Sequence, residues 1–203
     1  MTIQTMRAMQ ANAFSIDALQ MVQVPRPVAG AGEIVVKVAA ASLNFRDLAI
    51  ITGSYFPDLA LPYVPASDCV GTVVEVGAGV SRFAVGDRVI PCYIQGWREG
   101  ELTQEQRKTK TLGALMTGVL QDFVAVPAGD AVAAPDCLTD VEAATMPIAA
   151  LTAWHCLQAG EIAAGKTVLV QGTGGVSLFA LQFAKALGAT VVALTSTAQK
   201  ADM

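Results

Sequence analysis

The chain has 203 residues, of which 53% are hydrophobic and 15% charged, with a formal net charge of −4. This composition excludes a disordered chain, and the acidic balance gives no basic surface for nucleic acid. No apolar run approaches the roughly 20 residues of a membrane span, and the first residues lack the apolar core of a secretory signal. We therefore expect a cytoplasmic protein of one large or two small domains.

Short apolar and β-branched runs dominate the first 135 residues and are separated by glycine and proline. They predict strands at 6–13, 19–24, 34–38, 70–77, 89–94 and 119–126, and a loop-rich strand within 128–135. Repeated short strands that are separated by glycine and proline are typical of a partly closed β barrel. Residues 95–118 contain many charged and few large apolar side chains. We therefore expect a solvated segment that leaves the barrel and has room for one helical turn.

A polar cluster, Leu43-Asn-Phe-Arg-Asp47, follows the third predicted strand inside an apolar neighbourhood. It is the first place in the chain where chemistry could occur. Residues 47–51 are expected to turn helically. The proline-rich loop after them contains Tyr55 and Tyr63, whose hydroxyls could donate a proton or simply pack with a wet hydroxyl.

Two helices are expected after the barrel. Thr139 and Glu142 fit a capping box, which predicts a short helix at 143–146, and Pro147 suits the first position of a second helix that ends at Gly160. The only histidine, His155, is expected to pack within that helix. The four cysteines stand at 69, 92, 137 and 156. They are too widely spaced to form a zinc site, so buried free thiols are the better interpretation.

The most informative motif of the sequence lies near the end of the chain. A β-branched run at 167–171 leads into glycines, a helical run at 176–187 and a second β-branched run at 190–194. Strand, glycine turn, helix and strand form the opening unit of a dinucleotide-binding sheet. Gly172 would permit the tight turn and Gly174 the approach of a pyrophosphate to the helix N-terminus. An ordinary structural turn is the alternative.

Several stretches together resemble the medium-chain dehydrogenase/reductase superfamily, in the family order. They are Gly32–Val38, Ser42–Asp47, Val70–Gly77, Arg82–Val89, Ala143–Pro147, Leu151–Trp154 and Gln171–Ser177. The resemblance implies an α/β protein with a GroES-like barrel at 1–135, which would bind substrate. Bridging helices and the first βαβ of a Rossmann NAD(P)-binding domain would follow at 136–203. The quinone oxidoreductase-like and alcohol dehydrogenase-like zinc-independent branch is the most similar.

Differences from the family's zinc-binding pattern indicate the zinc-independent branch. In zinc-dependent members a cysteine, a histidine and an adjacent acid stand where this chain has Asn44, Ser67 and Asp68. Neutral amide and hydroxyl groups do not replace thiolate and imidazole as zinc ligands, so no zinc is expected. Asn44 and Arg46 are the candidate oxyanion donors, and Tyr55 is a candidate proton donor. Asp47 is a weaker catalytic candidate, because pairing with Arg46 or capping the helix explains it better.

The residues expected to bind the cofactor are Gly172, Thr173, Gly174, Gly175, Val176, Ser196 and Lys200. An acidic side chain about 20 residues past the glycines would bind the ribose hydroxyl of NAD. This chain instead has Leu194-Thr-Ser-Thr197, with Lys200 after it. Hydroxyls and a nearby cation tolerate a 2′-phosphate, so NADP(H) is favoured over NAD(H).

The sequence thus predicts an NAD(P)H-dependent oxidoreductase that acts on a small carbonyl, alcohol, quinone or activated alkene. A non-catalytic nucleotide-binding or scaffold protein is the alternative. A dinucleotide fold uses about six strands, and the chain ends two strands in. We therefore expect a truncated product or fragment, or a partner that completes the sheet. Self-association and weak or no catalysis by the isolated chain are expected with it.

Overall fold

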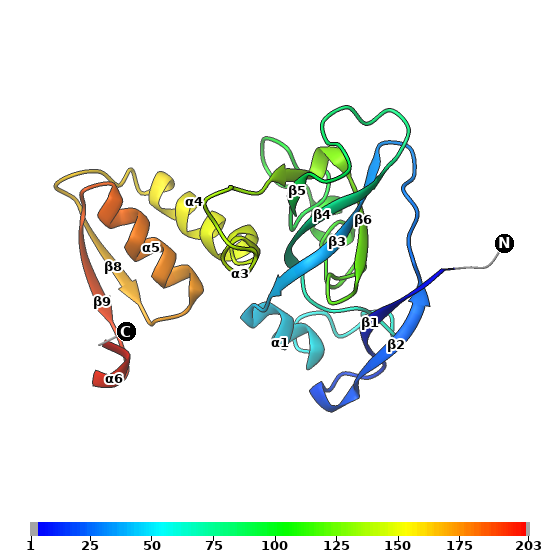
Figure 1. Ribbon diagram of the computed structural model, residues 1–203. Coiled ribbons are helices and arrows are strands. Elements are labelled where there is room, and N and C mark those ends of the chain that lie inside the picture. The colour runs from blue at the N-terminus through cyan, green and yellow to red at the C-terminus, as the bar shows by residue number, and fades with distance from the viewer. Residues whose placement is uncertain (1–3, 202–203) are drawn as a thin grey trace. The chain divides into compact units, whose positions relative to one another are not determined.

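The computed structural model describes residues 4–201 and divides the chain into two compact units, Met1–Pro147 and Ile148–Met203 (Figure 1). The first is built on curled antiparallel strands, and the second on two parallel strands with helices. None of the helices within residues 4–201 combines the length and hydropathy that a membrane crossing requires.

The first unit begins with a hairpin, β1 (Thr5–Ala11) and β2 (Leu19–Pro25), joined through a 3₁₀ turn at Ile16–Ala18. The Ser15 hydroxyl caps this turn by accepting the Asp17 N–H at 3.2 Å. Isolated bridges from Ala8 to Gln121 and from Ala11 to Tyr63 attach the hairpin to the rest of the unit. The two strands and polar turn predicted here are confirmed.

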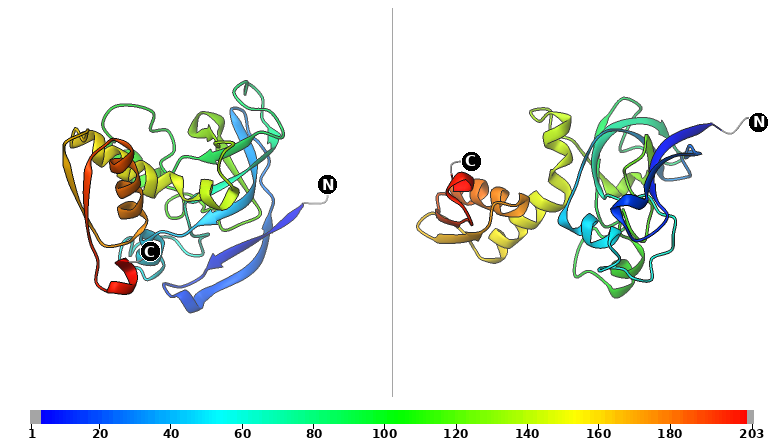
Figure 2. Two further views of the ribbon diagram at one scale, coloured as in Figure 1. Left: turned by 60° about the vertical axis from the view of Figure 1, so that its left-hand side comes forward. Right: turned by 90° about the horizontal axis from the view of Figure 1, so that it is seen from below.

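A five-stranded antiparallel sheet forms the body of the first unit, in the order β6-β3-β4-β5-β7. Its strands are β3 (Glu33–Ser42), β4 (Asp68–Val76), β5 (Arg88–Pro91), β6 (Phe123–Pro127) and β7 (Ala131–Ala133). Two register shifts between β3 and β4 bend the sheet, which curls as Figures 1 and 2 show. The predicted partly closed barrel is confirmed, with a core that includes Ile34, Val36, Val73, Val89, Val124 and Val126.

Close packing of β3 on β4 depends on Gly71. A Cβ atom built on this glycine would collide with the Lys37 carbonyl oxygen and come within 2.7 Å of the Val36 Cγ1 atom. Glycine is therefore the side chain that lets the two strands meet at this point. The pairing extends to Ser42 opposite Asp68, at the end of the sheet where the candidate site lies.

Three short helices accompany the sheet: α1 (Phe45–Ile51), α2 (Gln104–Thr109) and α3 (Asp140–Ala144), which contacts β3 and β4. The Thr139–Glu142 capping box is confirmed at the start of α3. The helix expected to start at Pro147 is not separate, because π-helical Met146–Ala150 runs directly into the next helix.

Residues 95–118 are only partly the solvated segment that we expected. Helix α2 is indeed polar and carries no buried residue. Gln95 and Leu112, however, are 2% and 1% exposed. Gly113 fits against the Ala66 backbone, which a Cβ atom would approach to 2.5 Å. The ends of this segment therefore belong to the core, because they pack on the chain just before β4.

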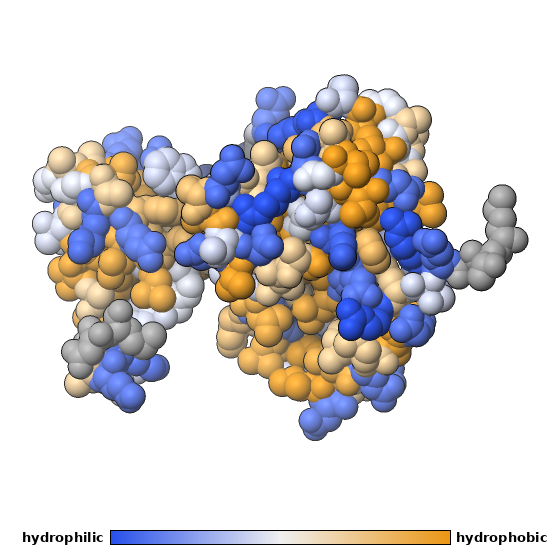
Figure 3. Space-filling view, in the orientation of Figure 1, coloured by the Kyte–Doolittle hydropathy of each residue, from blue (hydrophilic) through white to orange (hydrophobic). Residues whose placement is uncertain are grey.

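The second unit contains α4 (Leu151–Ala159), β8 (Thr167–Gln171), α5 (Gly175–Ala186), β9 (Thr190–Leu194) and α6 (Ala198–Ala201). Strands β8 and β9 are parallel, and α5 contacts both. This confirms the predicted strand–turn–helix–strand unit. On α5 only Ala184 is buried, and Figure 3 shows hydrophobic side chains at the surface of this unit, including Leu169, Val176, Leu178, Val192 and Leu194.

Candidate active site

The end of β3 and the start of β4 bring together Asn44, Ser67 and Asp68, the three positions that the family resemblance matched to zinc ligands. Because Ser42 pairs with Asp68, Asn44 just beyond β3 reaches the first residue of β4. The Asn44 Nδ2 group donates to Asp68 Oδ2 at 3.0 Å, and the Ser67 hydroxyl donates to Asp68 Oδ1 at 3.1 Å. Ser67 and Asp68 are fully buried, and Asn44 is partly exposed.

Asp47 caps helix α1. Its Oδ2 atom accepts the backbone N–H of Asn44 at 2.7 Å, while its Oδ1 atom lies 4.0 Å from Arg46 Nη1. The carboxyl is buried, and burial raises its pKa, although the Asn44 N–H and the Arg46 charge act in the opposite direction. The capping that we expected is present. A catalytic role for Asp47 stays a prediction.

Arg46 holds together segments that are distant in sequence. Its Nη1 group donates to the Leu112 carbonyl at 3.2 Å, and its guanidinium lies 4.7 Å from the ring centre of Tyr93 and 5.9 Å from that of Phe56. Nε and Nη2 are buried and have no hydrogen-bond partner among the described residues. Arg46 thus anchors the 95–118 segment, and its oxyanion role stays a prediction.

The tyrosines near this cluster differ in exposure. Tyr55 is 57% exposed and its ring meets Phe56 edge-on at 4.8 Å. Tyr63 is buried, which raises its pKa to about 12. Tyr93, which sequence reasoning missed, is half-buried, and burial raises its pKa more than Arg46 lowers it. No local motif marks Tyr93, because it reaches Arg46 only through the fold.

The thiols and the histidine do not gather into a metal centre. Within residues 4–201 no group of three His, Cys, Asp or Glu side chains could hold a metal ion. All four cysteines are free, but only Cys69 is buried; Cys137 and Cys156 are exposed, so the expectation of uniformly buried thiols is wrong. His155 is also exposed, on α4, rather than packed.

The glycine turn of the second unit leaves open space at the start of α5. Gly172 has φ +83°, and Gly174 is extended at the N-cap of the twelve-residue helix α5. A Cβ atom added to either glycine would meet nothing within 4 Å. Ser177 stands where the Gly-x-Gly-x-x-Gly pattern of dinucleotide-binding turns, begun here by Gly172 and Gly174, would have its third glycine. Its hydroxyl donates to the Gln171 carbonyl at 2.9 Å, which ties the helix to β8.

The other predicted cofactor residues continue from this turn. Thr173 lies inside it, and Gly175 and Val176 begin α5. Ser196 follows β9, and Lys200 lies on α6. The Lys200 Nζ group donates to the Ser196 hydroxyl at 3.4 Å. The structure therefore brings the hydroxyl and the cation together.

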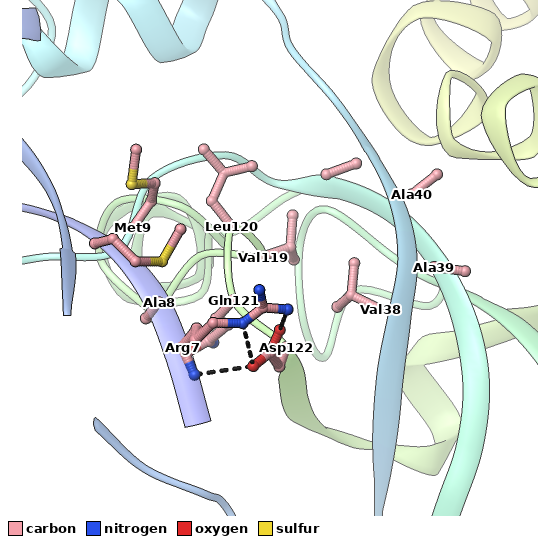
Figure 4. A pocket seen from close by; sticks show the side chains of 12 residues that line it. Arg7, Ala8, Met9, Val38, Ala39, Ala40, Val119, Leu120, Gln121 and Asp122 are labelled. Atoms are coloured by element: carbon pink, nitrogen blue, oxygen red, sulfur yellow. Dashed lines mark hydrogen bonds and ion pairs between the residues drawn. The ribbon is translucent and has the colours of Figure 1, made fainter. Parts of the chain in front are cut away.

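A separate pocket of about 300 Å³ in the first unit contains none of the predicted site residues (Figure 4). Its lining is mostly apolar, with Met9 and Val38 on its walls, and includes the exposed Arg7–Asp122 ion pair at 3.0 Å. Exposed ion pairs contribute little stability, and we assign this pocket no role in the candidate site.

Comparison with known proteins identifies the family. The model of the alcohol dehydrogenase GroES-like domain matches residues 30–136. A zinc-type alcohol dehydrogenase-like protein of Schizosaccharomyces pombe is 42% identical, over 84% of this chain and 50% of its own length. Acryloyl-coenzyme A reductase of Metallosphaera sedula is 35% identical, over 90% of this chain and 56% of its own length.

The fold agrees with these relatives. The solved quinone oxidoreductase of Coxiella burnetii matches with a TM-score of 0.78 at 27% identity, covering 97% of this chain and 58% of that protein. The chain therefore spans between 50% and 58% of the length of these proteins. The matched domain, the curled barrel and the parallel strand–helix unit agree, and the chain belongs to the medium-chain dehydrogenase/reductase superfamily.

Proposed function

We propose that this chain belongs to a zinc-independent, NADP(H)-dependent oxidoreductase. Residues 1–135 would bind the substrate, and residues 136–203 would contribute to the nucleotide site. When bound, the nicotinamide would exchange a hydride with a carbonyl or alcohol, a quinone or an activated alkene. The observation that carries the proposal is the open glycine turn at the start of α5.

The turn would bind the cofactor's pyrophosphate through the backbone. The first N–H groups of α5 have no partners within the helix and face outward at its N-terminus. Gly174 has no side chain to keep a phosphate away, and the space beside it is open. Thr173, Gly175 and Val176 would line the same turn.

The preference for NADP(H) depends on Ser196 and Lys200. Their mutual contact of 3.4 Å places a hydroxyl donor and a cation just after β9. The corresponding stretch 194–197 carries no carboxylate to bind an unmodified ribose. A 2′-phosphate would gain a charge-assisted contact from Lys200.

The proposed independence from zinc is supported by the donor set at the barrel site. Asn44 and Ser67 offer an amide and a hydroxyl, and both donate to Asp68. The neighbouring Cys69 is buried, which together with Asp68 raises its pKa to about 12 and disfavours a thiolate ligand. These residues do not fit a zinc ion. Neutral donors, Asn44 first, would instead stabilise negative charge on the substrate oxygen.

The experiment is a thermal melt of the chain with excess NADPH or NADH. A ligand that binds only the folded state adds about 2.7 kcal/mol of stability at a hundredfold excess over Kd. We expect a rise in Tm with NADPH and a much smaller one with NADH. Gly174→Val should abolish the NADPH shift. The matched variant Gly160→Ala should keep it, because Gly160 is outside the turn and an added Cβ would make ordinary contacts there.

A scaffold protein without turnover is the second candidate. The structural engagement of Arg46 and Asp47 favours it, since both side chains hold the fold around α1. A cooperative melt that NADPH does not shift would support this candidate and contradict the first.

A further inference from the structure

The carboxylate of Asp68 lies at the centre of the polar contacts of the barrel site. It is fully buried, as is Ser67 beside it. Its two oxygens accept from different donors, Oδ1 from Ser67 at 3.1 Å and Oδ2 from Asn44 at 3.0 Å. Such donors offset the cost of burying a carboxylate. The carboxylate in turn restrains the groups that donate to it.

The restraint matters most for Asn44. A carboxylate can only accept, so its contact with Asn44 fixes which end of the amide carries nitrogen. One N–H of Nδ2 is used in this contact, and within residues 4–201 no group accepts the other. The side chain is partly exposed. A hydrogen-bond donor of fixed direction therefore remains available.

A second carboxylate restrains the Asn44 backbone. Asp47 Oδ2 accepts the Asn44 N–H at 2.7 Å, which fixes the peptide from which the side chain extends. The two contacts come from different elements, α1 and β4. Asn44 is thus held at its backbone and at its amide, as a preorganised donor requires.

We propose that Asp68, supported by Ser67, is a positioning residue that aims the free N–H of Asn44 at the oxygen of a carbonyl substrate. The proposal rests on the proposed function and names the substrate group recognised at that site. Asp68 does not itself touch the substrate. Its effect is to prevent the Asn44 amide from turning its own oxygen toward the substrate oxygen.

The test uses ¹⁵N-labelled chain and cyclohexanone, a saturated ketone that does not alkylate the exposed cysteines. The side-chain amide signals of Asn44 are assigned by their loss in Asn44→Ser. We expect cyclohexanone to shift one of the two Asn44 amide protons. In Asp68→Asn, where the amide can turn, apparent binding of cyclohexanone should weaken by about tenfold, the effect of one hydrogen bond.

If Asp68→Asn does not fold, Ser67→Ala, which removes the hydroxyl that supports Asp68, takes its place and should weaken cyclohexanone binding in the same direction. Two further variants act as controls. Asn44→Gln retains an amide but moves it, and should lose the response to cyclohexanone. Asp87→Asn changes an exposed turn carboxylate and should leave the response intact. The backbone signal of Ile50, a core residue of α1, reports in each variant whether the fold is preserved.

The proposal is overturned if cyclohexanone shifts neither Asn44 proton in the wild-type chain, or shifts them equally in wild type and a folded Asp68→Asn. The same spectra test the proposed function separately, through the response of the Gly174 backbone amide to NADPH. If the Gly174 amide does not shift with NADPH but the Asn44 amide shifts with cyclohexanone, the cofactor assignment is rejected and the positioning role is kept. If the Gly174 amide shifts with NADPH but the Asn44 amide does not shift with cyclohexanone, the cofactor assignment is kept and the positioning role is rejected.

Discussion

Burial changes the ionisation of individual side chains around the candidate site. Asp47 caps α1, and Cys69 lies inside β4. Both lose water on folding, and the pKa of each group is raised because burial disfavours its charged form. Each shift leads to a measurable consequence for stability or reactivity.

Asp47→Asn should change how stability depends on pH. A carboxyl whose pKa is higher in the folded state contributes stability below its unfolded pKa, and loses it as pH rises through the folded pKa. Asparagine keeps an acceptor for the Asn44 N–H without the buried charge. Relative to wild type, the variant should therefore become more stable as pH rises from about 3 to 7.

Urea unfolding at several pH values measures this difference, with Asp58→Asn on the exposed loop as the control for loss of one charge. A difference between Asp47→Asn and wild type that stays flat, or that falls with rising pH, would contradict the prediction.

The cysteines should separate by reactivity. Cys137 and Cys156 are exposed, whereas Cys69 is fully buried with its pKa raised from 9.0 to about 12. At pH 8 the thiolate fraction of Cys69 is roughly a thousandfold below that of an unperturbed thiol. Iodoacetamide followed by peptide mass spectrometry should label Cys137 and Cys156 first and Cys69 only in urea. Early labelling of Cys69 in folded protein would disprove its burial.

Among the elements, the strands were the most predictable and the loops the least. β3 and β4 follow runs rich in β-branched residues beside glycines, β1 and β2 follow apolar runs on either side of a polar turn, and α5 follows a helical run that ends at a glycine. β5 is shorter than the predicted 89–94, because Pro91 cannot donate to a neighbouring strand. β6 starts later than predicted, since residues 119–122 bond to the hairpin and to the 64–66 segment instead.

The candidate site was predictable where its residues are close in sequence. Asn44, Arg46 and Asp47 lie within one motif, and the capping contact follows from their spacing. Tyr93 and Leu112 were missed, because only the fold brings them to Arg46. The burial of residues 111–114 was also missed, because the charged residues before them made the whole segment resemble a solvated one.

Arg46→Met should loosen this segment. The substitution keeps an apolar stem but removes the bond to the Leu112 carbonyl and the stacking on Tyr93 and Phe56. We expect a loss of about 2 kcal/mol of stability and faster trypsin cleavage in the polar stretch that carries Arg98, Arg107, Lys108 and Lys110.

Arg82→Met is the matched control, because Arg82 is exposed and its ring contact is with the neighbouring Phe83, at 5.3 Å. Equal cleavage rates in the Arg46 and Arg82 variants would mean that Arg46 does not anchor the segment.

At the scale of the whole molecule, the two units carry one tryptophan each. Trp97 lies in the first unit, where its Nε1 group donates to the Gly100 carbonyl at 3.0 Å. Trp154 lies in the second unit, on α4, with its ring 5.9 Å from Phe183 of α5. Because the chain has only these two tryptophans, single Trp→Phe variants separate the fluorescence of the two units.

NADPH should stabilise the second unit selectively. Its proposed contacts all lie between Gly172 and Lys200, so in Trp97→Phe the melt reported by Trp154 should move upward with NADPH. In Trp154→Phe the melt reported by Trp97 should move much less, since the barrel has a core of its own. Equal shifts in both variants would show that the units unfold as one cooperative body. Binding at the glycine turn would then stabilise the barrel as well, and the barrel site and the turn could not be treated as energetically independent.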